Sequence, residues 1–126
     1  MKVQIIVPGE HADAESVRRA SRARWGLLLE AGAEIYEYLP TMYHCKVMIV
    51  DSLLVSVGST NFDNRSFQLN DEANLNIYDA EFAARQIEVF QDDLARSRRV
   101  SLQEWKKRPR VEKVWEHAAS LLGSQM

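Results

Sequence analysis

The sequence is poor in the residues that mark several special classes of protein. Its 126 residues include one cysteine, three prolines and five glycines. No apolar run approaches the roughly 18 residues that a membrane-spanning helix needs. The single cysteine, Cys45, cannot form an intrachain disulfide, so a disulfide scaffold is excluded. The low glycine and proline content excludes a collagen-like fibre. What remains is an ordinary globular chain, long enough for one core.

Neither sign of charge dominates, but the two signs are unevenly placed. Sixteen Lys and Arg against eighteen Asp and Glu give a formal net charge of −2. Residues 71–93 hold seven acids and one base, Arg85, whereas residues 96–113 hold eight bases and two acids, a net charge of +6. This basic segment is either a solvated helix face or a contact for phosphates or anionic headgroups.

The first third of the chain has the pattern of a strand–helix–strand unit. Residues 3–7 are a short apolar run, which predicts a buried strand. Residues 13–31 keep helical apolar spacing, with Asp13 as the N-cap and Gly32 as the stop. Residues 33–38 predict a second strand. Such a unit favours a parallel strand pair joined by a right-handed crossover.

A predicted hairpin follows, with strands at residues 45–50 and 53–57 around a turn at Asp51 and Ser52. Residues 58–71 are polar and indicate an ordered loop. Residues 72–78 alternate between apolar and polar side chains, which predicts a strand with one apolar face.

The last third of the chain is predicted to be helical. Asp79 caps a helix over residues 80–97, and residues 101–104 form a capping box for a short helix that Pro109 ends. Residues 110–122 place their apolar side chains on one helical face. The predicted class is therefore α/β, with one mixed β-sheet flanked by helices.

Six residues at fixed spacing carry the chemistry. They spell H-x-K-x4-D-x6-G-S-x-N and are His44, Lys46, Asp51, Gly58, Ser59 and Asn61. With each residue type at about one in twenty, chance yields this pattern about once in a million chains of this length. His44 and Lys46 lie two apart on a predicted strand and so project from the same face. The hairpin then returns Ser59 and Asn61 to that neighbourhood.

These groups together suit the chemistry of a phosphoryl group. The imidazole of His44 can attack phosphorus, while the ammonium of Lys46 and the neutral donors of Ser59 and Asn61 offset charge on the phosphate oxygens. Because Lys46 supplies positive charge, we expect neither a divalent metal nor another cofactor. The motif also lacks the clustered carboxylates that metal-dependent transfer uses.

The motif and the residues after it resemble the phospholipase D superfamily. Asp-x-Arg-Ser-Phe and Asn-x-Glu-x-Asn follow the motif between Ser59 and Asp79, as in the C-terminal half of bacterial cardiolipin synthases. The resemblance covers residues 2–108. It implies a phospholipase D-like half-domain over residues 1–108 that lacks its first helix and strand, followed by an amphipathic helix over residues 109–126.

The resemblance implies roles for the residues that match the family's motif. His44 would be the nucleophile or the general acid. Lys46, Ser59 and Asn61 would bind phosphate. Glu72 stands where the family has a carboxylate that hydrogen-bonds the histidine ring.

Three further residues are assigned from the same pattern. Asp51 is expected to be structural because it lies at the hairpin turn, and Gly58 is expected to be structural within the motif. Arg65 either binds substrate phosphate or braces the loop, and the sequence leaves both readings open.

The implied activity is phosphatidyl transfer or phosphodiester cleavage through a phosphohistidine, with a phosphatidylglycerol-like phospholipid as substrate. It needs a second motif, from a homodimer mate or from a missing N-terminal half. Two alternatives stay open: a metal-independent phospholipase D-like nuclease, and a catalytically silent fragment that needs a second half. The expected location is the cytoplasm, with peripheral attachment to the inner membrane through residues 96–113 as an open option.

Overall fold

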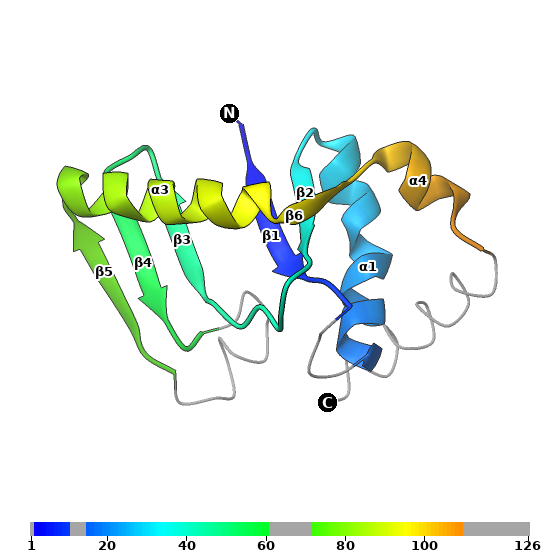
Figure 1. The fold of residues 1–126 in the computed structure, drawn as a ribbon, viewed down its shortest axis with the longest axis horizontal. Coiled ribbons are helices and arrows are strands. Elements are labelled where there is room, and N and C mark those ends of the chain that lie inside the picture. The colour runs from blue at the N-terminus through cyan, green and yellow to red at the C-terminus, as the bar shows by residue number, and fades with distance from the viewer. Residues whose placement is uncertain (1, 11–14, 61–71, 110–126) are drawn as a thin grey trace. The chain divides into compact units, whose positions relative to one another are not determined.

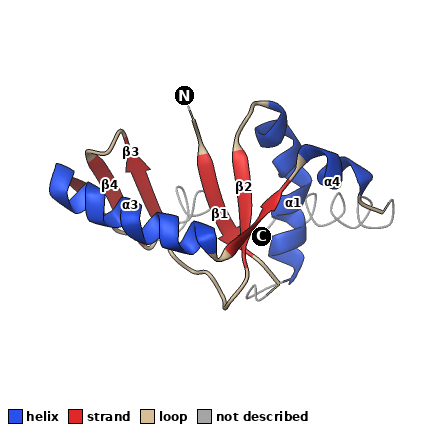
Figure 2. Ribbon diagram, turned by 45° about the horizontal axis from the view of Figure 1, so that its top comes forward, coloured by secondary structure: helices blue, strands red, loops and turns tan. Residues whose placement is uncertain are grey.

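The computed structural model describes residues 2–10, 15–60 and 72–109, and the chain divides into two compact units. The first unit runs to Tyr43 and resumes at Leu94, and the second runs from His44 to Asp93. Each holds a three-stranded sheet (Figures 1 and 2). The predicted α/β class is confirmed, but the described strands form two sheets where the sequence suggested one. Apolar patterns locate strands, whereas hydrogen bonding between distant segments decides which strands share a sheet.

The first sheet has the order β1-β2-β6. β1 (Gln4–Pro8) pairs parallel to β2 (Glu34–Tyr38), and α1 (Glu15–Glu30) connects them, so the predicted strand–helix–strand unit is confirmed. β6 (Ser97–Val100) pairs antiparallel to β2. The prediction missed β6, because its Ser-Arg-Arg-Val sequence lacks apolar alternation and directly follows a helix.

The predicted stop of α1 at Gly32 is confirmed. The backbone N–H of Gly32 donates to the carbonyl of Leu29 at 3.1 Å, and that of Ala33 donates to the carbonyl of Leu28 at 2.9 Å. These two bonds define a Schellman motif, which needs a left-handed residue at its end. Gly32 has φ +88°, which glycine adopts without steric cost. The N-cap predicted at Asp13 lies outside the described residues.

Two other predicted helix starts are confirmed by their hydrogen bonds. Oδ1 of Asp79 accepts from the N–H of Phe82 at 2.7 Å at the start of α3 (Ala80–Ala95). Oγ of Ser101 accepts from the N–H of Glu104 at 3.1 Å at the start of α4 (Leu102–Lys107). The terminal helix predicted for residues 110–122 lies outside the described residues, so the proposed domain boundary near residue 108 stays a prediction.

The core of the first unit joins α1, the sheet and α4. Its buried members are Trp25, Ile35 and Val100. Trp105 of α4 packs against them, and its indole N–H donates to the carbonyl of Arg22 at 2.8 Å. Gly26 permits this close approach, because a Cβ added there would lie 2.7 Å or less from ring atoms of Trp105.

Several bases of the basic segment, residues 96–113, form salt bridges within the first unit. Three of its bases form salt bridges with acids: Arg98 with Glu37 and Glu104, Arg99 with Glu34, and Lys106 with Glu30. The carboxylate of Glu37 is buried, and hydrogen bonds from Arg98 to Glu104 and Glu37 raise the pKa of Arg98. These pairs partly offset the charge of the segment, and its contact with an anionic membrane stays a prediction.

Glu34 should make the stability of the first unit depend on acidic pH. A hydrogen bond from Gln4 at 2.8 Å is the main cause that holds the pKa of Glu34 below its ordinary value of 4.5. Desolvation opposes it, and the charges of Lys2 and Arg99 lower the pKa further. A carboxyl with a lowered folded-state pKa stabilises the fold above its ordinary pKa and loses that contribution as the pH falls through the folded value.

Glu34→Gln should therefore unfold at lower urea than wild type at neutral pH, and the difference should shrink as the pH falls below 4.5. Urea titrations across this pH range measure the effect. A difference in unfolding free energy that stays constant with pH would contradict the assignment.

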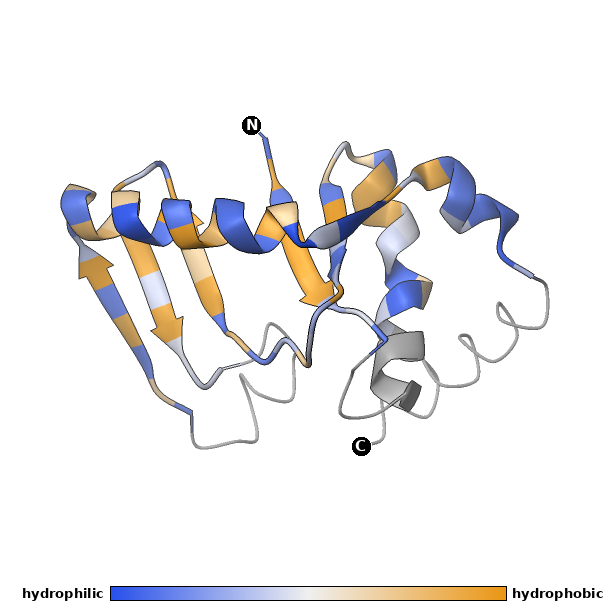
Figure 3. Cartoon of the chain, in the orientation of Figure 1, coloured by the Kyte–Doolittle hydropathy of each residue, from blue (hydrophilic) through white to orange (hydrophobic). Residues whose placement is uncertain are grey.

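The second unit is an antiparallel meander. β3 (Val47–Val50), β4 (Leu54–Gly58) and β5 (Asn74–Tyr78) pair in that order. α3 crosses one face of the sheet (Figure 1), and apolar and polar residues succeed one another along its strands and around α3 (Figure 3). Val55 of β4 and Ala83 of α3 are completely buried.

Over the ranges that the structure describes, no helix combines the length and the hydropathy needed to cross a bilayer.

One face of this sheet is covered by α3, and the other carries exposed apolar side chains. Ile77 pairs with Val55 and lines a small depression together with Phe82 of α3, so α3 lies on the face of Val55. Strand alternation and register place four apolar residues on the opposite face: Met48, Val50, Leu54 and Tyr78. Met48, Val50 and Tyr78 are 37%, 36% and 73% exposed, so this face carries accessible apolar surface.

Candidate active site

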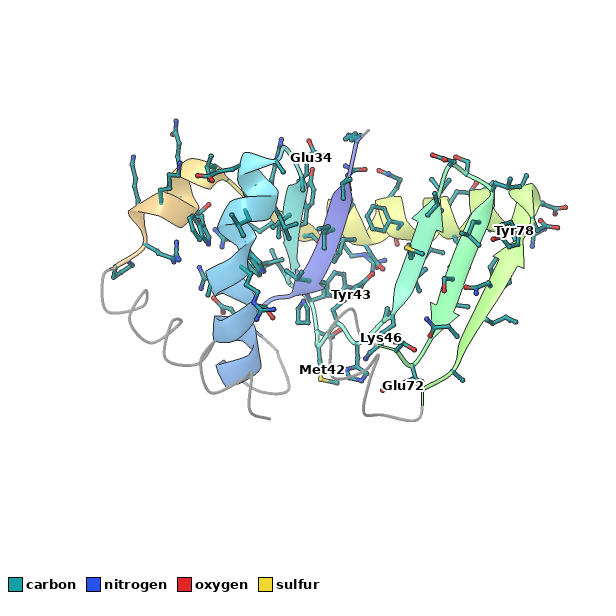
Figure 4. The ribbon with its side chains drawn as sticks, turned by 180° about the vertical axis from the view of Figure 1, so that it is seen from behind. Glu34, Met42, Tyr43, Lys46, Glu72 and Tyr78 are labelled. Atoms are coloured by element: carbon teal, nitrogen blue, oxygen red, sulfur yellow. The ribbon has the colours of Figure 1, made fainter. Side chains whose placement is uncertain are left out.

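Five of the six motif residues are described by the structure. Four of them, His44, Lys46, Gly58 and Ser59, lie at one edge of the second sheet, and Asp51 lies at the other end of the hairpin. β3 begins, β4 ends and β5 begins at this edge, because the three strands run alternately up and down. Lys46 immediately precedes β3, Ser59 immediately follows β4, and Glu72 lies two residues before β5. Figure 4 shows Lys46 and Glu72 at this end of the strands. The meander thus brings together residues up to 26 positions apart in the sequence.

Backbone hydrogen bonds continue the strand pairing into the site. The N–H of Gly58 donates to the carbonyl of Lys46 at 3.2 Å, and the N–H of Ser59 donates to the carbonyl of Ala73 at 3.0 Å. These bonds fix the backbone of Lys46 and Ser59 relative to each other, although neither residue belongs to a strand.

The predicted strand over residues 45–50 is wrong at its start. β3 begins at Val47, so His44, Cys45 and Lys46 lie before it, and strand alternation cannot be used to orient their side chains. His44 is exposed. The Nζ of Lys46 donates to the backbone carbonyl of His44 at 2.9 Å, which ties the two residues together by another route. An ammonium has three donors, so this bond leaves capacity for phosphate oxygens.

Ser59 accepts a hydrogen bond through its side-chain oxygen, which leaves its hydroxyl proton available for donation. Its Oγ accepts a hydrogen bond from the N–H of Ala73 at 3.2 Å. Because the oxygen acts as acceptor, the hydroxyl proton can still be donated to a substrate oxygen. This geometry supports the predicted phosphate-binding role of Ser59.

The sequence prediction missed two residues, Thr60 and Asn74, that join the end of β4 to the start of β5. The N–H of Thr60, which is buried, donates to Oδ1 of Asn74 at 3.3 Å. Asn74 is the last residue of the Asn-x-Glu-x-Asn stretch, so the signal was present but carried no assigned role. Asn61 and Arg65, predicted to bind or brace around phosphate, lie outside the described residues and remain predictions.

Glu72 is partly buried at the same edge, where a carboxylate could orient an imidazole. Its predicted hydrogen bond to the ring of His44 stays a prediction. In the described ranges no three His, Cys, Asp or Glu side chains gather as a metal site would require.

Gly58 lies where the chain has no room for a side chain. A Cβ added there would overlap the carbonyl oxygen of Ala73 and Oδ1 of Asn74, and would lie 2.7 Å from the Cα of Asn74. Because the obstacles include backbone, they cannot move aside cheaply. This crowding supports the structural role predicted for Gly58.

Asp51 lies at the β3–β4 turn, at the other end of the hairpin from the site. Asp51 and Ser52 have φ +49° and +53°, and the N–H of Leu53 donates to the carbonyl of Val50 at 3.1 Å. Asp and Asn tolerate the left-handed region better than other residues with a Cβ. The backbone therefore gives Asp51 a structural reason to be present.

We expect Asp51→Asn to leave the unfolding free energy nearly unchanged and Asp51→Ala to lower it by about 1 kcal/mol, the scale of a left-handed penalty. Chemical denaturation measures both. Any activity of the chain should be equal in the two variants, corrected for the folded fraction. A large loss of activity in folded Asp51→Asn would contradict a purely structural role.

Comparisons with known proteins agree on one family. The model described as cardiolipin synthase, PLD-like domain, matches residues 1–94. Cardiolipin synthase 2 of Bacillus anthracis is 38% identical over 120 residues, which cover 95% of this chain and 23% of that protein. Cardiolipin synthase A of Proteus mirabilis is 42% identical over 114 residues, which cover 90% and 23%. The chain thus spans about a quarter of the length of the curated relatives it matches.

A solved structure shares the fold. The crystal structure of the phospholipase D family member Nuc from Salmonella typhimurium has a TM-score of 0.70 and 24% sequence identity. The match covers 80% of this chain and 65% of that one. With the family model over residues 1–94 and four of the motif residues at one sheet edge, the chain belongs to the phospholipase D-like domain family of the cardiolipin synthases.

Proposed function

We propose that the chain supplies one catalytic half of an enzyme that transfers a phosphatidyl group through a phosphohistidine. The observation that carries the proposal is that Lys46, Ser59 and Glu72 lie at one edge of the second sheet and that Nζ of Lys46 donates to the backbone carbonyl of His44. The names of the relatives, which are cardiolipin synthases, favour a phospholipid over other phosphodiesters.

The proposed reaction has two balanced steps. In the first, a ring nitrogen of His44 attacks the lipid phosphorus, a nitrogen–phosphorus bond forms, and the phosphorus–oxygen bond to the leaving alcohol breaks. A second acid protonates the leaving oxygen. In the next step a lipid alcohol, or water, attacks the phosphohistidine, gives up its proton to the same second group, and releases His44.

The remaining site residues would act on the phosphate and on the ring. Lys46, Ser59 and Asn61 would donate to the phosphate oxygens, whose charge rises in the transition state. Glu72 would hydrogen-bond the ring of His44, fixing its tautomer and favouring its charged form. Arg65 would either contact substrate phosphate or brace the loop.

The second acid would be the histidine of another copy of the motif. It could come from a homodimer mate or from an N-terminal half. The accessible apolar face of Met48, Val50 and Tyr78 supports association with further protein, because apolar surface of this kind marks interaction sites. The substrate would be a phosphatidylglycerol-like lipid, which implies a cytoplasmic protein working at the inner membrane.

A transfer assay tests this function. The chain is mixed with vesicles of phosphatidylglycerol labelled in the phosphatidyl group, and labelled diphosphatidylglycerol is measured across a range of chain concentrations. For a homodimeric site, the rate should rise faster than linearly with concentration, and Lys46→Ala should reduce it at least about a hundredfold. Arg85→Gln removes a remote charge and serves as the control.

Two results would contradict the proposal. One is the absence of labelled product both from the chain at concentrations where light scattering shows a dimer and from its mixture with a separately expressed N-terminal half. The other is cleavage of a DNA phosphodiester by the wild-type chain, lost in Lys46→Ala, without any lipid transfer. That second result would assign the same site to nucleic acid.

A further inference from the structure

Side-chain oxygens accept backbone hydrogen bonds where the second sheet ends at the candidate site. Antiparallel strands exchange two backbone bonds at every second residue pair. At the end of β4 the N–H of Ser59 donates to the carbonyl of Ala73, as such an exchange requires. The N–H of Ala73, however, donates to Oγ of Ser59 at 3.2 Å. The regular exchange between β4 and β5 therefore changes character at this pair.

On the other side of β4, the register with β3 predicts a partner for the N–H of Thr60. Continued past the strand ends, this register sets Lys46 opposite Gly58 and, two residues further, His44 opposite Thr60. The N–H of Gly58 does donate to the carbonyl of Lys46 at 3.2 Å. Because bonded pairs recur every two residues, continued pairing would direct the N–H of Thr60 to the carbonyl of His44.

The structure gives each of these two groups a different partner. The N–H of Thr60 donates to Oδ1 of Asn74 at 3.3 Å. The carbonyl of His44 accepts from Nζ of Lys46 at 2.9 Å. Thr60 is buried, and a buried N–H needs an acceptor, which Asn74 provides from the side of β5. His44 and Lys46 accordingly lie before β3 and not within it.

Gly58 makes room for the side chain of Asn74. The two residues are opposite each other in the β4–β5 pairing, so their side chains would share one face of the sheet. A Cβ added at Gly58 would overlap Oδ1 of Asn74. The absence of that Cβ lets the amide of Asn74 lie against the end of β4 and reach the N–H of Thr60.

We propose that Asn74 is a positioning residue that ends the pairing of β3 with β4 at the candidate active site. By accepting the N–H of Thr60, Asn74 turns this donor away from the carbonyl of His44, which binds the ammonium of Lys46. The segment that carries His44 and Lys46 thereby stays outside the strand. The consequence for phosphatidyl transfer rests on the proposed function, whereas the position of the strand end does not.

Backbone carbon-13 chemical shifts test the strand end. The Cα and Cβ shifts of residues 44–46 are measured by NMR in wild type, Asn74→Ala, Asn74→Asp and Asn76→Ala. Asn76 is the matched control, because it lies two residues further along β5 and pairs with Ser56. Both asparagines are exposed, so their replacement opens no cavity.

In Asn74→Ala the three residues should shift toward strand values, because the N–H of Thr60 then pairs with the carbonyl of His44. Asn74→Asp keeps an acceptor oxygen in the same place, and Asn76→Ala keeps Asn74 itself. Both should therefore retain the wild-type shifts.

The rate of phosphatidyl transfer, corrected for the folded fraction, is the second readout. We expect kcat of Asn74→Ala to fall about ten- to hundredfold, because a displacement of about 1 Å can cost about a hundredfold in rate. Asn74→Asp should recover kcat, while its KM rises because the added negative charge repels an anionic lipid. Asn76→Ala should match wild type in both constants.

The two readouts separate this proposal from the proposed function. Unchanged shifts in Asn74→Ala, or the same change of shifts in Asn76→Ala, would overturn the role of Asn74. The expected shifts without transfer by any of the four proteins, wild type included, would contradict the proposed function and still support the role of Asn74 at the strand end.

Discussion

Replacing His44 with alanine should lower phosphatidyl transfer by at least about a thousandfold, the scale seen when a catalytic nucleophile is removed. The side chain of His44 is exposed, so its removal opens no cavity. The unfolding free energy should change by no more than about 0.5 kcal/mol. The rate of labelled diphosphatidylglycerol formation and a urea titration of the same preparation check the two expectations.

His44→Gln is the matched variant, because it keeps a polar side chain but provides no ring nitrogen that can attack phosphorus. It should be as inactive as His44→Ala. Retention of more than about a tenth of the wild-type rate in either folded variant would remove His44 from the role of nucleophile.

Replacing Gly58 with alanine should impair both stability and transfer. The new methyl group would overlap the backbone of Ala73 and the side chain of Asn74, so the strand end or the loop must shift. We expect a loss of about 2–3 kcal/mol in unfolding free energy, as for overpacking against groups that cannot move. The remaining folded protein should also transfer more slowly, because Ser59 follows directly.

Gly32→Ala is the control for that experiment. Nothing lies within 4 Å of a Cβ added at Gly32, and its cost comes only from φ +88°. We expect a loss of about 1 kcal/mol and no change in transfer by the folded chain. Equal stability of Gly58→Ala and wild type would show that the crowding at Gly58 is unimportant.

The parts of the fold that the sequence predicted well are set by local hydrogen bonds. Gly32 ends α1, Asp79 starts α3 and Ser101 starts α4, and each uses partners within five residues. β6 escaped prediction because its signal is not local. Arg98 and Arg99 pair there with Glu37 and Glu34 of β2, some sixty residues away in the chain.

In the candidate site, too, the features set by nearby residues were predicted, and those set by distant residues were missed. The spacing of the motif predicted that Lys46 and Ser59 would meet, because a hairpin returns the chain to its start. The prediction placed the beginning of β3 two residues too early, at Cys45, because the sequence does not mark where pairing with β4 begins within the stretch before Val47. Asn74 was missed because its bond to Thr60 depends on how a loop meets a strand 14 residues later.

Trapping the covalent intermediate tests the central claim most directly. The chain is mixed with phosphatidylglycerol labelled in the phosphatidyl group, at a concentration where light scattering shows a dimer. After rapid denaturation, protein-bound label is measured by mass spectrometry, with acid treatment as a check on the linkage. The account predicts an acid-labile phosphatidyl adduct on His44 in the wild type, and none in His44→Ala. Equal labelling of the two proteins, or an adduct mapped to another residue, would contradict it.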